Sequence, residues 1–115
     1  MDKTENPLKM YILLRDFMDP GHDMLAAAHA SLAGYIEFKD HPDTEAWLKE
    51  SFRKVVCTVT DTEFEKAKKY EDYRVMTESA FEGKEVAIVF RPRREWPKFF
   101  WFLKLYTGKE KRSVC

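Results

Sequence analysis

The residues best suited to chemistry stand where a short turn opens an alanine-rich segment. Asp19, Pro20 and Gly21 form the turn, His22 follows it directly, and His29 lies seven residues further on. An imidazole can serve as a general base near neutral pH. Helix N-termini bind anions through their backbone N–H groups, and ligands of α/β proteins collect at the carboxyl ends of strands. The sequence therefore predicts a site at this turn, with His22 as base or cation and the amides at Gly21 as anion donors.

A carboxylate partner for His22 is expected in the loop before the last predicted strand. Glu78 could pair with the imidazole, an arrangement that suits general-base hydrolysis, and Ser79 could donate a hydrogen bond to a substrate. Structural interpretations of the same residues remain open, with His22 as a solvated turn histidine and Glu78 as a solvent-facing loop residue. The hydrolytic interpretation requires the His22 and Glu78 side chains to meet.

Neither a metal centre nor a cofactor is expected. Although His22 and His29 share a helix face, they are separated by about 10 Å along the axis, at about 1.5 Å per residue, which is too far for one metal ion. The chain has no CxxC or HExxH spacing. His29 falls on an apolar stripe with Leu25 and Leu32, so we expect it to be a hydrogen-bonded histidine beneath the sheet.

Basic and aromatic side chains gather in the last quarter of the chain. Arg91, Arg93 and Arg94 could contact the phosphates of a tRNA, or they could form a charged surface turn balanced by Glu95. The aromatic residues in 96–102 are too many for one helix face to bury. We therefore expect part of this segment to form a homodimer contact, with a base-stacking platform as the alternative.

Composition limits the class of protein. The 115 residues are 44% hydrophobic, which is enough for one domain with an ordinary core. Twenty basic and 20 acidic residues cancel, which excludes a binder that acts through bulk positive charge. No apolar run approaches the roughly 20 residues that cross a bilayer, and the polar N-terminus lacks the core of a secretory signal. We expect a cytoplasmic protein that contacts no membrane, with Cys57 and Cys115 reduced.

Periodicity and turn residues predict the elements that position the candidate site. Asp19 and Pro20 fit the N-cap and first position of a helix, and Thr60 with Glu63 has the capping-box spacing. Small alanines, such as Ala26 and Ala30, would let the first helix approach the sheet closely. Strands are predicted at 9–15, 54–60, 73–77 and 85–91, and helices at 20–38, 40–51, 60–70 and 98–106.

This element order, β-α-α-β-α-β-β-α, predicts an α/β protein with a mixed four-stranded sheet in a three-layer-like sandwich. One domain is expected over residues 9–107, between a flexible N-terminus (1–8) and a charged tail (108–115). Seven residues, 78–84, separate the last two predicted strands, so a two-residue hairpin turn is not expected there.

In this order the chain resembles the type-2 peptidyl-tRNA hydrolase family. That family has an apolar strand ending in Arg-Asp, a glycine that opens a helix with an Ala-Ala-Gln-x-Ala-His-Ala run, a tryptophan before its second strand, and a closing leucine-lysine-leucine helix. The corresponding segments here are 13–16, Gly21, 28–30, Trp47 and 102–106. The resemblance implies the family fold, ester hydrolysis of peptidyl-tRNA, a tRNA partner, and Asp16 among the substrate-binding residues.

Departures from the family pattern put the activity in doubt. His22 stands where the family has its active-site lysine, and Ala26 stands where it has a glutamine. Glu78 is nearest to the aspartate of the family's Asp-Ala-Gly-Arg-Thr loop, which is otherwise not kept. Two functions remain open. One is a divergent hydrolase of peptidyl-tRNA or a related aminoacyl ester, and the other is a non-catalytic relative that binds RNA, a small ligand or a protein.

Overall fold

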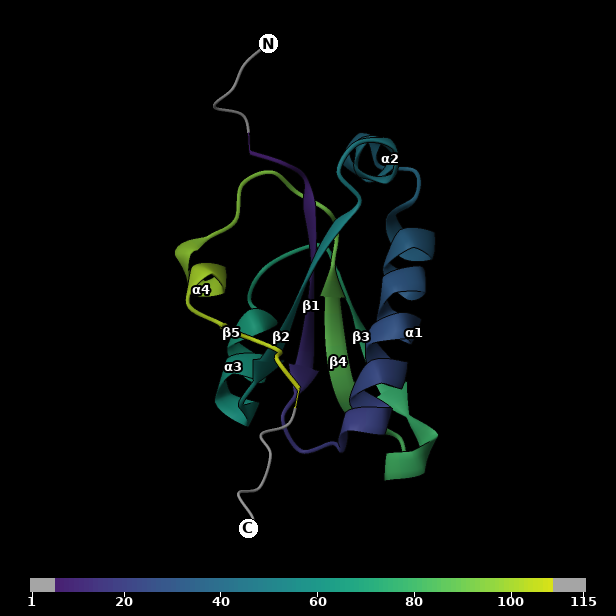
Figure 1. Ribbon diagram of the computed structural model, residues 1–115, viewed down its shortest axis with the longest axis vertical. Helices are drawn as coiled ribbons and strands as arrows, with labels where there is room; N and C mark the ends of the chain where they lie inside the picture. Colours follow the sequence, from purple (N-terminus) through teal and green to yellow (C-terminus); the bar gives the residue numbers. More distant parts are fainter. Residues whose placement is uncertain (1–5, 109–115) are drawn as a thin grey trace.

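The computed structural model describes residues 6–108, which form one mixed sheet with helices on both faces (Figure 1). The strands are β1 (Lys9–Arg15), β2 (Arg53–Val59), β3 (Tyr73–Glu78), β4 (Lys84–Phe90) and β5 (Lys104–Leu105). The helices are α1 (Pro20–Phe38), α2 (Pro42–Lys49), α3 (Asp61–Ala67) and α4 (Lys98–Trp101), with a 3₁₀ helix η1 (Ser79–Phe81). The predicted α/β class with a mixed sheet is confirmed.

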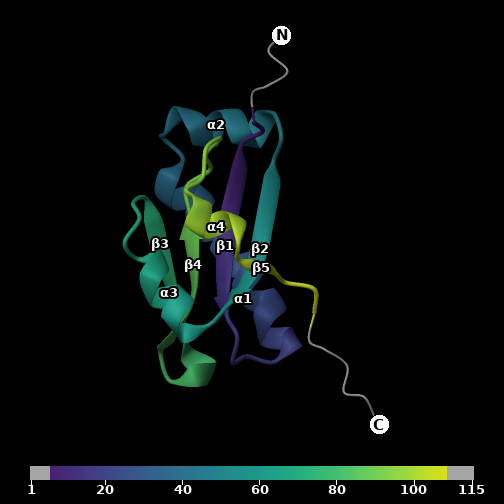
Figure 2. The same ribbon diagram turned by 90° about the vertical axis from the view of Figure 1, so that its left-hand side faces the viewer.

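The strand order across the sheet is β3-β4-β1-β2-β5. β1 and β2 are parallel, and every other neighbouring pair is antiparallel. Figure 2 views the sheet from the side of α3 and α4, with α1 behind it. Because β1 and β2 are parallel, their starts meet at one end of the sheet. The end of β1 leads at the other end into the candidate turn.

β1 is buried on both faces because it occupies the middle of the sheet. Met10, Ile12 and Leu14 belong to the core cluster that includes residues of α1 and α2. Tyr11 and Leu13 belong to the second cluster, which includes residues of α3 and α4. This alternation follows from the two-residue period of a strand, and it explains why the strand is apolar throughout.

α1 begins as predicted, and its small residues face the sheet as expected, but its stripe of larger residues does not. Asp19 is the N-cap, and Pro20 takes the first helical position. The buried face is made of small residues, among them Ala26, Ala30 and Gly34. A Cβ on Gly34 would lie only 2.7 Å from Val89 Cγ2, so the helix axis lies very close to β4.

The stripe of larger residues on α1 faces outward instead. Leu25, Leu32 and Ile36 are 44%, 61% and 53% exposed, and His29 is exposed as well. The prediction of a histidine beneath the sheet is therefore wrong. Close packing decides the orientation, because leucines on the inner face would hold the helix further from β4 than Gly34 places it.

The other predicted helices and strands are confirmed, with their ends shifted by a few residues, except at the C-terminus. The capping box of Thr60 and Glu63 opens α3, with both reciprocal hydrogen bonds formed. Residues 79–83, including η1, connect β3 to β4, so the connection is longer than a two-residue turn, as predicted.

The predicted closing helix is wrong beyond Trp101, and so is the four-stranded sheet. α4 has a single turn, and Lys104–Leu105 pair with β2 as a fifth strand. A strand forms there because Thr58 and Cys57 present a free sheet edge to Lys104 and Leu105. That contact is non-local, so the local sequence pattern does not contain it.

Some predictions fall on the ends of the chain. Residues 1–5 and 109–115 lie outside the described residues, and with them most of the expected flexible N-terminus, the charged tail and Cys115. Leu8, by contrast, is buried at 1% exposure and joins the core. Within residues 6–108, no helix has both the length and the apolar character needed to span a bilayer.

Candidate functional site

His22 pairs with the carboxylate of its own helix cap. Its ring Nδ1 lies 2.9 Å from Asp19 Oδ2, and its backbone N–H donates to Asp19 Oδ1 at 2.9 Å. These two hydrogen bonds lower the pKa of the Asp19 carboxyl group. The carboxylate therefore stays ionised beside the imidazole and favours the Nδ1–H form of the ring, which leaves Nε2 to accept a proton.

An aromatic side chain fixes the other side of the His22 ring. Phe81, from η1, contacts the imidazole edge-on at 4.9 Å between ring centroids. Phe81 also packs edge-on against Phe17, at 5.2 Å. The His22 side chain is 36% exposed, so it is held on one side and reachable by water on the other. This contact joins the start of α1 to the β3–β4 connection, but through Phe81 and not through the Glu78 carboxylate that the hydrolytic interpretation requires.

Glu78 has a different role from the predicted one. Its carboxylate accepts the backbone N–H of Ala80 at 3.1 Å and so caps η1. His22 takes Asp19 as its partner, which lies within the same helical turn. Ser79 is exposed as the first residue of η1. Phe81 is the residue of the β3–β4 connection that contacts His22.

The N-terminus of α1 already has a negative charge beside its backbone N–H groups, the carboxylate of Asp19. Asp19 Oδ1 accepts the His22 N–H, and Gly21 lies exposed in the first turn. A second anion at this helix end would be repelled by the Asp19 carboxylate. The predicted anion site at the Gly21 turn is therefore disfavoured, although Asp19 itself was expected as the cap.

The end of β1 is held by Arg15, and Asp16 follows it on the surface. Arg15 Nη1 donates to the Glu85 carbonyl at 2.8 Å, and Arg15 Nη2 pairs with Asp61 at 2.8 Å. The Asp16 side chain is exposed, and its backbone N–H donates to the Val59 carbonyl at 3.1 Å. These bonds tie β1 to β4, β2 and α3, and so fix the point from which the turn departs.

The three arginines predicted to bind phosphate do not form one free basic face. Arg91 is bound by Asp43 and Asp72, each at 3.0 Å, and its side chain is only 12% exposed. Arg94 pairs with Glu50 at 3.3 Å. Arg93 lies over the Trp96 ring, with Cζ 5.1 Å from the centroid. Acidic residues distant in the sequence supply these partners, which is why the sequence overstated the cluster.

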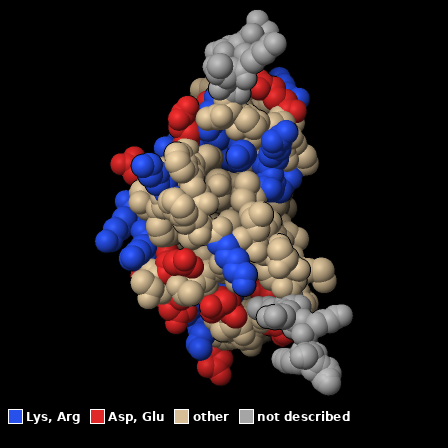
Figure 3. All heavy atoms as spheres, turned by 60° about the vertical axis from the view of Figure 1, so that its left-hand side comes forward, with Lys and Arg blue, Asp and Glu red and all other residues tan. Residues whose placement is uncertain are grey.

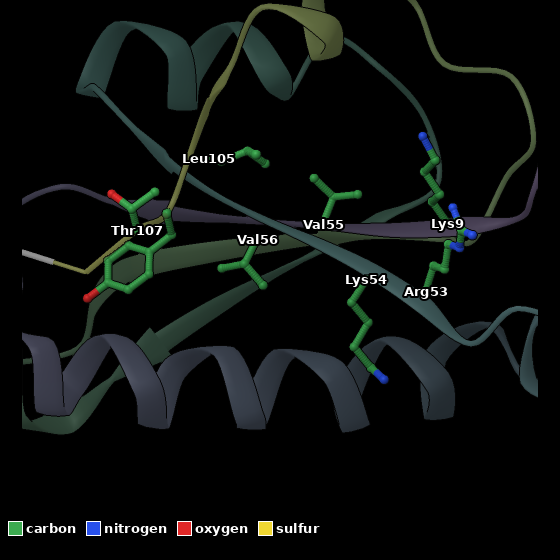
Figure 4. A pocket seen from close by; sticks show the side chains of 8 residues that line it. Lys9, Arg53, Lys54, Val55, Val56, Leu105 and Thr107 are labelled. Atoms are coloured by element: carbon green, nitrogen blue, oxygen red, sulfur yellow. The ribbon is translucent and has the colours of Figure 1, made fainter.

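A cavity of about 610 Å³ lies instead at the edge of the sheet between β2 and β5 (Figure 4). β5 pairs with Cys57 and Thr58, so within residues 6–108 the first half of β2 has no strand on the side away from β1. Val55 and Leu105 line the apolar side of the cavity. Lys9 and Arg53 stand together at one end, while Lys54 turns toward α1.

The cations of this edge groove (Lys9, Arg53 and Lys54) have no acidic partner in the part of the chain that the structure describes. None of the three forms an ion pair within residues 6–108, unlike Arg91 and Arg94. Lys54 Nζ lies 3.3 Å from the centroid of the Phe52 ring, and burial lowers the pKa of Lys54. Figure 3 shows Lys and Arg side chains gathered on the upper half of the face that carries α4.

A second cavity of about 400 Å³ adjoins the edge groove and shares Lys9 with it. Trp101 lines this cavity and is 61% exposed. Together the two cavities bring Lys9, which forms no ion pair among the described residues, near the exposed ring of Trp101.

Tyr106 closes the far end of the edge groove and links it to α1. Its backbone N–H donates to the Val56 carbonyl at 2.8 Å. Burial raises the pKa of Tyr106, and a hydrogen bond with the buried Asp23 carboxylate raises it further. Asp23 follows His22 directly in α1. The groove thus runs from the cations at the start of β1 and β2 toward the first turn of α1.

Two features of the candidate sites were missed in the sequence. Asp19 was identified as a cap, yet its place three residues before His22, one helical turn away, also marks it as a partner for the ring. Lys9 and Arg53 each begin a strand, and Lys9 pairs with Arg53 across the parallel pair. Matching cations at the starts of two strands expected to lie side by side would have been the signal for the groove.

Neither a protein-family model nor a curated protein matches the chain. The resemblance to type-2 peptidyl-tRNA hydrolases therefore stays a prediction that rests on the quoted motifs.

Proposed function

We propose that this protein is a hydrolase of an ester such as peptidyl-tRNA, with His22 as the general base. The observation that carries the proposal is the 2.9 Å contact between the His22 ring and the Asp19 carboxylate, at the carboxyl end of a central strand. Ligand sites of α/β proteins favour this position. Asp19 replaces Glu78 as the partner of the base.

In the proposed reaction, His22 Nε2 takes a proton from a water whose oxygen attacks the ester carbonyl carbon. The ester C–O bond then breaks, and the imidazolium returns the proton to the departing ribose oxygen. The products are a free carboxylic acid and a free hydroxyl. Asp19 is a positioning residue, because its carboxylate holds the ring tautomer and stabilises the imidazolium without touching the substrate.

Replacement of the base tests this proposal against a matched histidine on the same helix. His22→Ala should lower turnover of N-acetyl-aminoacyl-tRNA at least 100-fold, within the range for a lost general base. His29→Ala should leave turnover unchanged, because His29 is exposed two turns away. Turnover is measured as release of the labelled amino acid, with the melting temperature as the control for folding.

Asp19→Asn separates catalysis from helix capping. Asparagine is as good an N-cap as aspartate, so the helix should remain, while the charge that supports the imidazolium is lost. We expect turnover to fall at least tenfold with little change in melting temperature. Well-folded wild-type protein without turnover, or a His22→Ala variant that retains full turnover, would reject the hydrolytic function.

A non-catalytic RNA-binding function is the second candidate, because Lys9 and Arg53 line the edge groove and form no ion pair within residues 6–108. Phosphates would neutralise Lys9 and Arg53, and a base could stack on the exposed Trp101 ring. This function needs neither the His22 ring nor a reaction.

Salt dependence tests the groove. The double variant Lys9→Gln/Arg53→Gln should bind tRNA more weakly, and the slope of log K against log salt should become shallower by about 2. The matched control is Lys66→Gln/Lys69→Gln, which removes the same charge from α3 and the turn after it and should leave the slope unchanged. Affinities come from fluorescence anisotropy at several salt concentrations. Equal losses in both variants would mean that only net charge matters and would remove the groove from the binding site.

A further inference from the structure

The outer face of α1 is an apolar surface without a charged side chain. Its large residues are Met24, Leu25, Leu32 and Ile36, which are 68%, 44%, 61% and 53% exposed. The two acidic residues of α1 lie elsewhere, since Asp23 is buried and Glu37 lies 3.9 Å from Arg74. Nothing within residues 6–108 covers this face, and Figure 1 shows α1 as the outermost element on its side of the sheet.

The apolar surface continues from α1 onto α2 and the start of β2. Leu48 and Phe52 are 44% and 52% exposed. With Ala28, Leu32, Tyr35 and Trp47 they line a cavity of about 250 Å³ beside the second half of α1. The face therefore protrudes at Met24 and Leu25, and it is hollowed further along the same helix.

We propose that this surface, the α1 face, joins two copies of the chain in a symmetric dimer with the two α1 helices antiparallel. A two-fold axis between Ala28 and His29 would bring Leu25 of each copy against Leu32 of the other. Met24 of each copy would then reach toward the other copy's hollow. The spacing of Leu25, Ala28, Leu32 and Tyr35, three, four and three residues, follows the 3.5-residue repeat of helices that pack side by side.

The available area fits a second copy. The six exposed large residues are Met24, Leu25, Leu32, Ile36, Leu48 and Phe52. If each loses about 100 Å², a value typical of one buried aliphatic side chain, they contribute roughly 600 Å² per copy. Ala28, His29 and Tyr35 extend this toward the roughly 800 Å² per partner of a standard interface.

Charge also favours the α1 face over the C-terminal aromatic segment as the dimer contact. Trp101 and Phe102 are 61% and 79% exposed, but they lie among the cations Arg94, Lys98 and Lys104. A two-fold axis there would set like charges against each other in the two copies. The large residues of the α1 face are uncharged, and the cation beside them is Lys54, whose Nζ lies 3.3 Å from the centroid of the Phe52 ring.

Paired substitutions on the two faces test the proposal by sedimentation velocity at protein concentrations in the micromolar range. We expect a dimer for the wild type, a monomer for Leu32→Glu, and a dimer for Phe102→Glu, which makes the same apolar-to-acidic change at a more exposed residue. Both residues are largely exposed, so both variants should remain folded and keep any tRNA hydrolase turnover per chain. A monomeric wild type would overturn the proposal, and so would a dimer that Phe102→Glu dissociates and Leu32→Glu does not.

Crosslinking tests the position of the axis. In a Cys115→Ser background, a short bis-maleimide should join two copies of Ala28→Cys, which the axis brings together. It should not join copies of Lys69→Cys, a position just after α3 on the opposite face of the sheet. Crosslinking of Lys69→Cys alone would overturn the proposed geometry.

Discussion

A single buried thiol illustrates how the environment of a residue changes its chemistry. Cys57 is 1% exposed in the middle of β2. Burial, and secondly the charge of Glu63, raises its pKa to about 11. The folded protein thus keeps the thiol protonated where the unfolded chain ionises it. Cys57 is therefore a core residue, without the thiolate character of a nucleophile.

This shift predicts a loss of stability in alkali. Between about pH 9 and pH 11 the unfolded state releases the Cys57 proton while the folded state holds it, so the unfolded state is favoured as the pH rises. The free energy of unfolding should fall more steeply with pH for the wild type than for Cys57→Val, which removes the group at similar volume. Urea denaturation at several pH values measures both slopes. Equal slopes would show that Cys57 does not titrate differently in the two states.

His22 shows what a sequence can and cannot say about a site at the residue scale. Its place after a turn, at the start of a helix, was evident from Asp19, Pro20 and Gly21. Its partner was misassigned to Glu78 because that pairing depends on where a distant loop lies. Asp19 is only three residues away, so its carboxylate contacts the His22 ring within the same helical turn. Local pairs of this kind can be inferred from a sequence more safely than pairs across a sheet.

At the scale of elements, α1 is the clearest case of packing overriding hydrophobicity. The stripe of Leu25, Leu32 and Ile36 would conventionally be placed against the core, yet the small face of Ala26, Ala30 and Gly34 lies there. The distance between helix and sheet sets this choice. Strand pattern and helix caps could be read from the sequence, whereas the inward face of α1 depends on the close approach of Val89.

Gly34 should therefore resist even the smallest side chain. A methyl group there would lie 2.7 Å from Val89 Cγ2 and 3.1 Å from Met10 Cε. We expect Gly34→Ala to lower the free energy of unfolding by about 1–3 kcal/mol through overpacking. Alanine's better helix propensity, about 1 kcal/mol, opposes this loss only to a limited extent.

The control for Gly34 is the same substitution in the first turn of the same helix. A Cβ on Gly21 would make an ordinary 3.4 Å contact with Asp19, so Gly21→Ala should be neutral or slightly stabilising. Thermal and urea denaturation compare the two variants. If Gly34→Ala were as stable as Gly21→Ala, the close approach of α1 to β4 would be wrong.

For the whole molecule, the α/β class and the mixed sheet followed from the sequence, but the last element and the edges of the sheet did not. β1 matches its predicted bounds because an apolar strand between Lys9 and Arg15 is a strong local signal. β5 is only two residues long, and its existence depends on the free edge of β2. The ion pairs of Arg91 with Asp43 and Asp72 likewise join segments far apart in the chain. Because of such non-local contacts, the expected basic cluster stabilises the fold and is not free to bind a ligand.

Because β5 is short, part of β2 is a free sheet edge that could lead to aggregation, and charged residues of β2 itself oppose this. On its outer side the first half of β2 pairs with no strand within residues 6–108, and such a sheet edge is a template on which another polypeptide could polymerise, the usual starting point of edge-to-edge aggregation. Arg53 and Lys54 occupy that stretch. Two molecules meeting through this edge would set these cations against each other. Neutralising them should therefore make the protein less soluble, whatever else the groove binds.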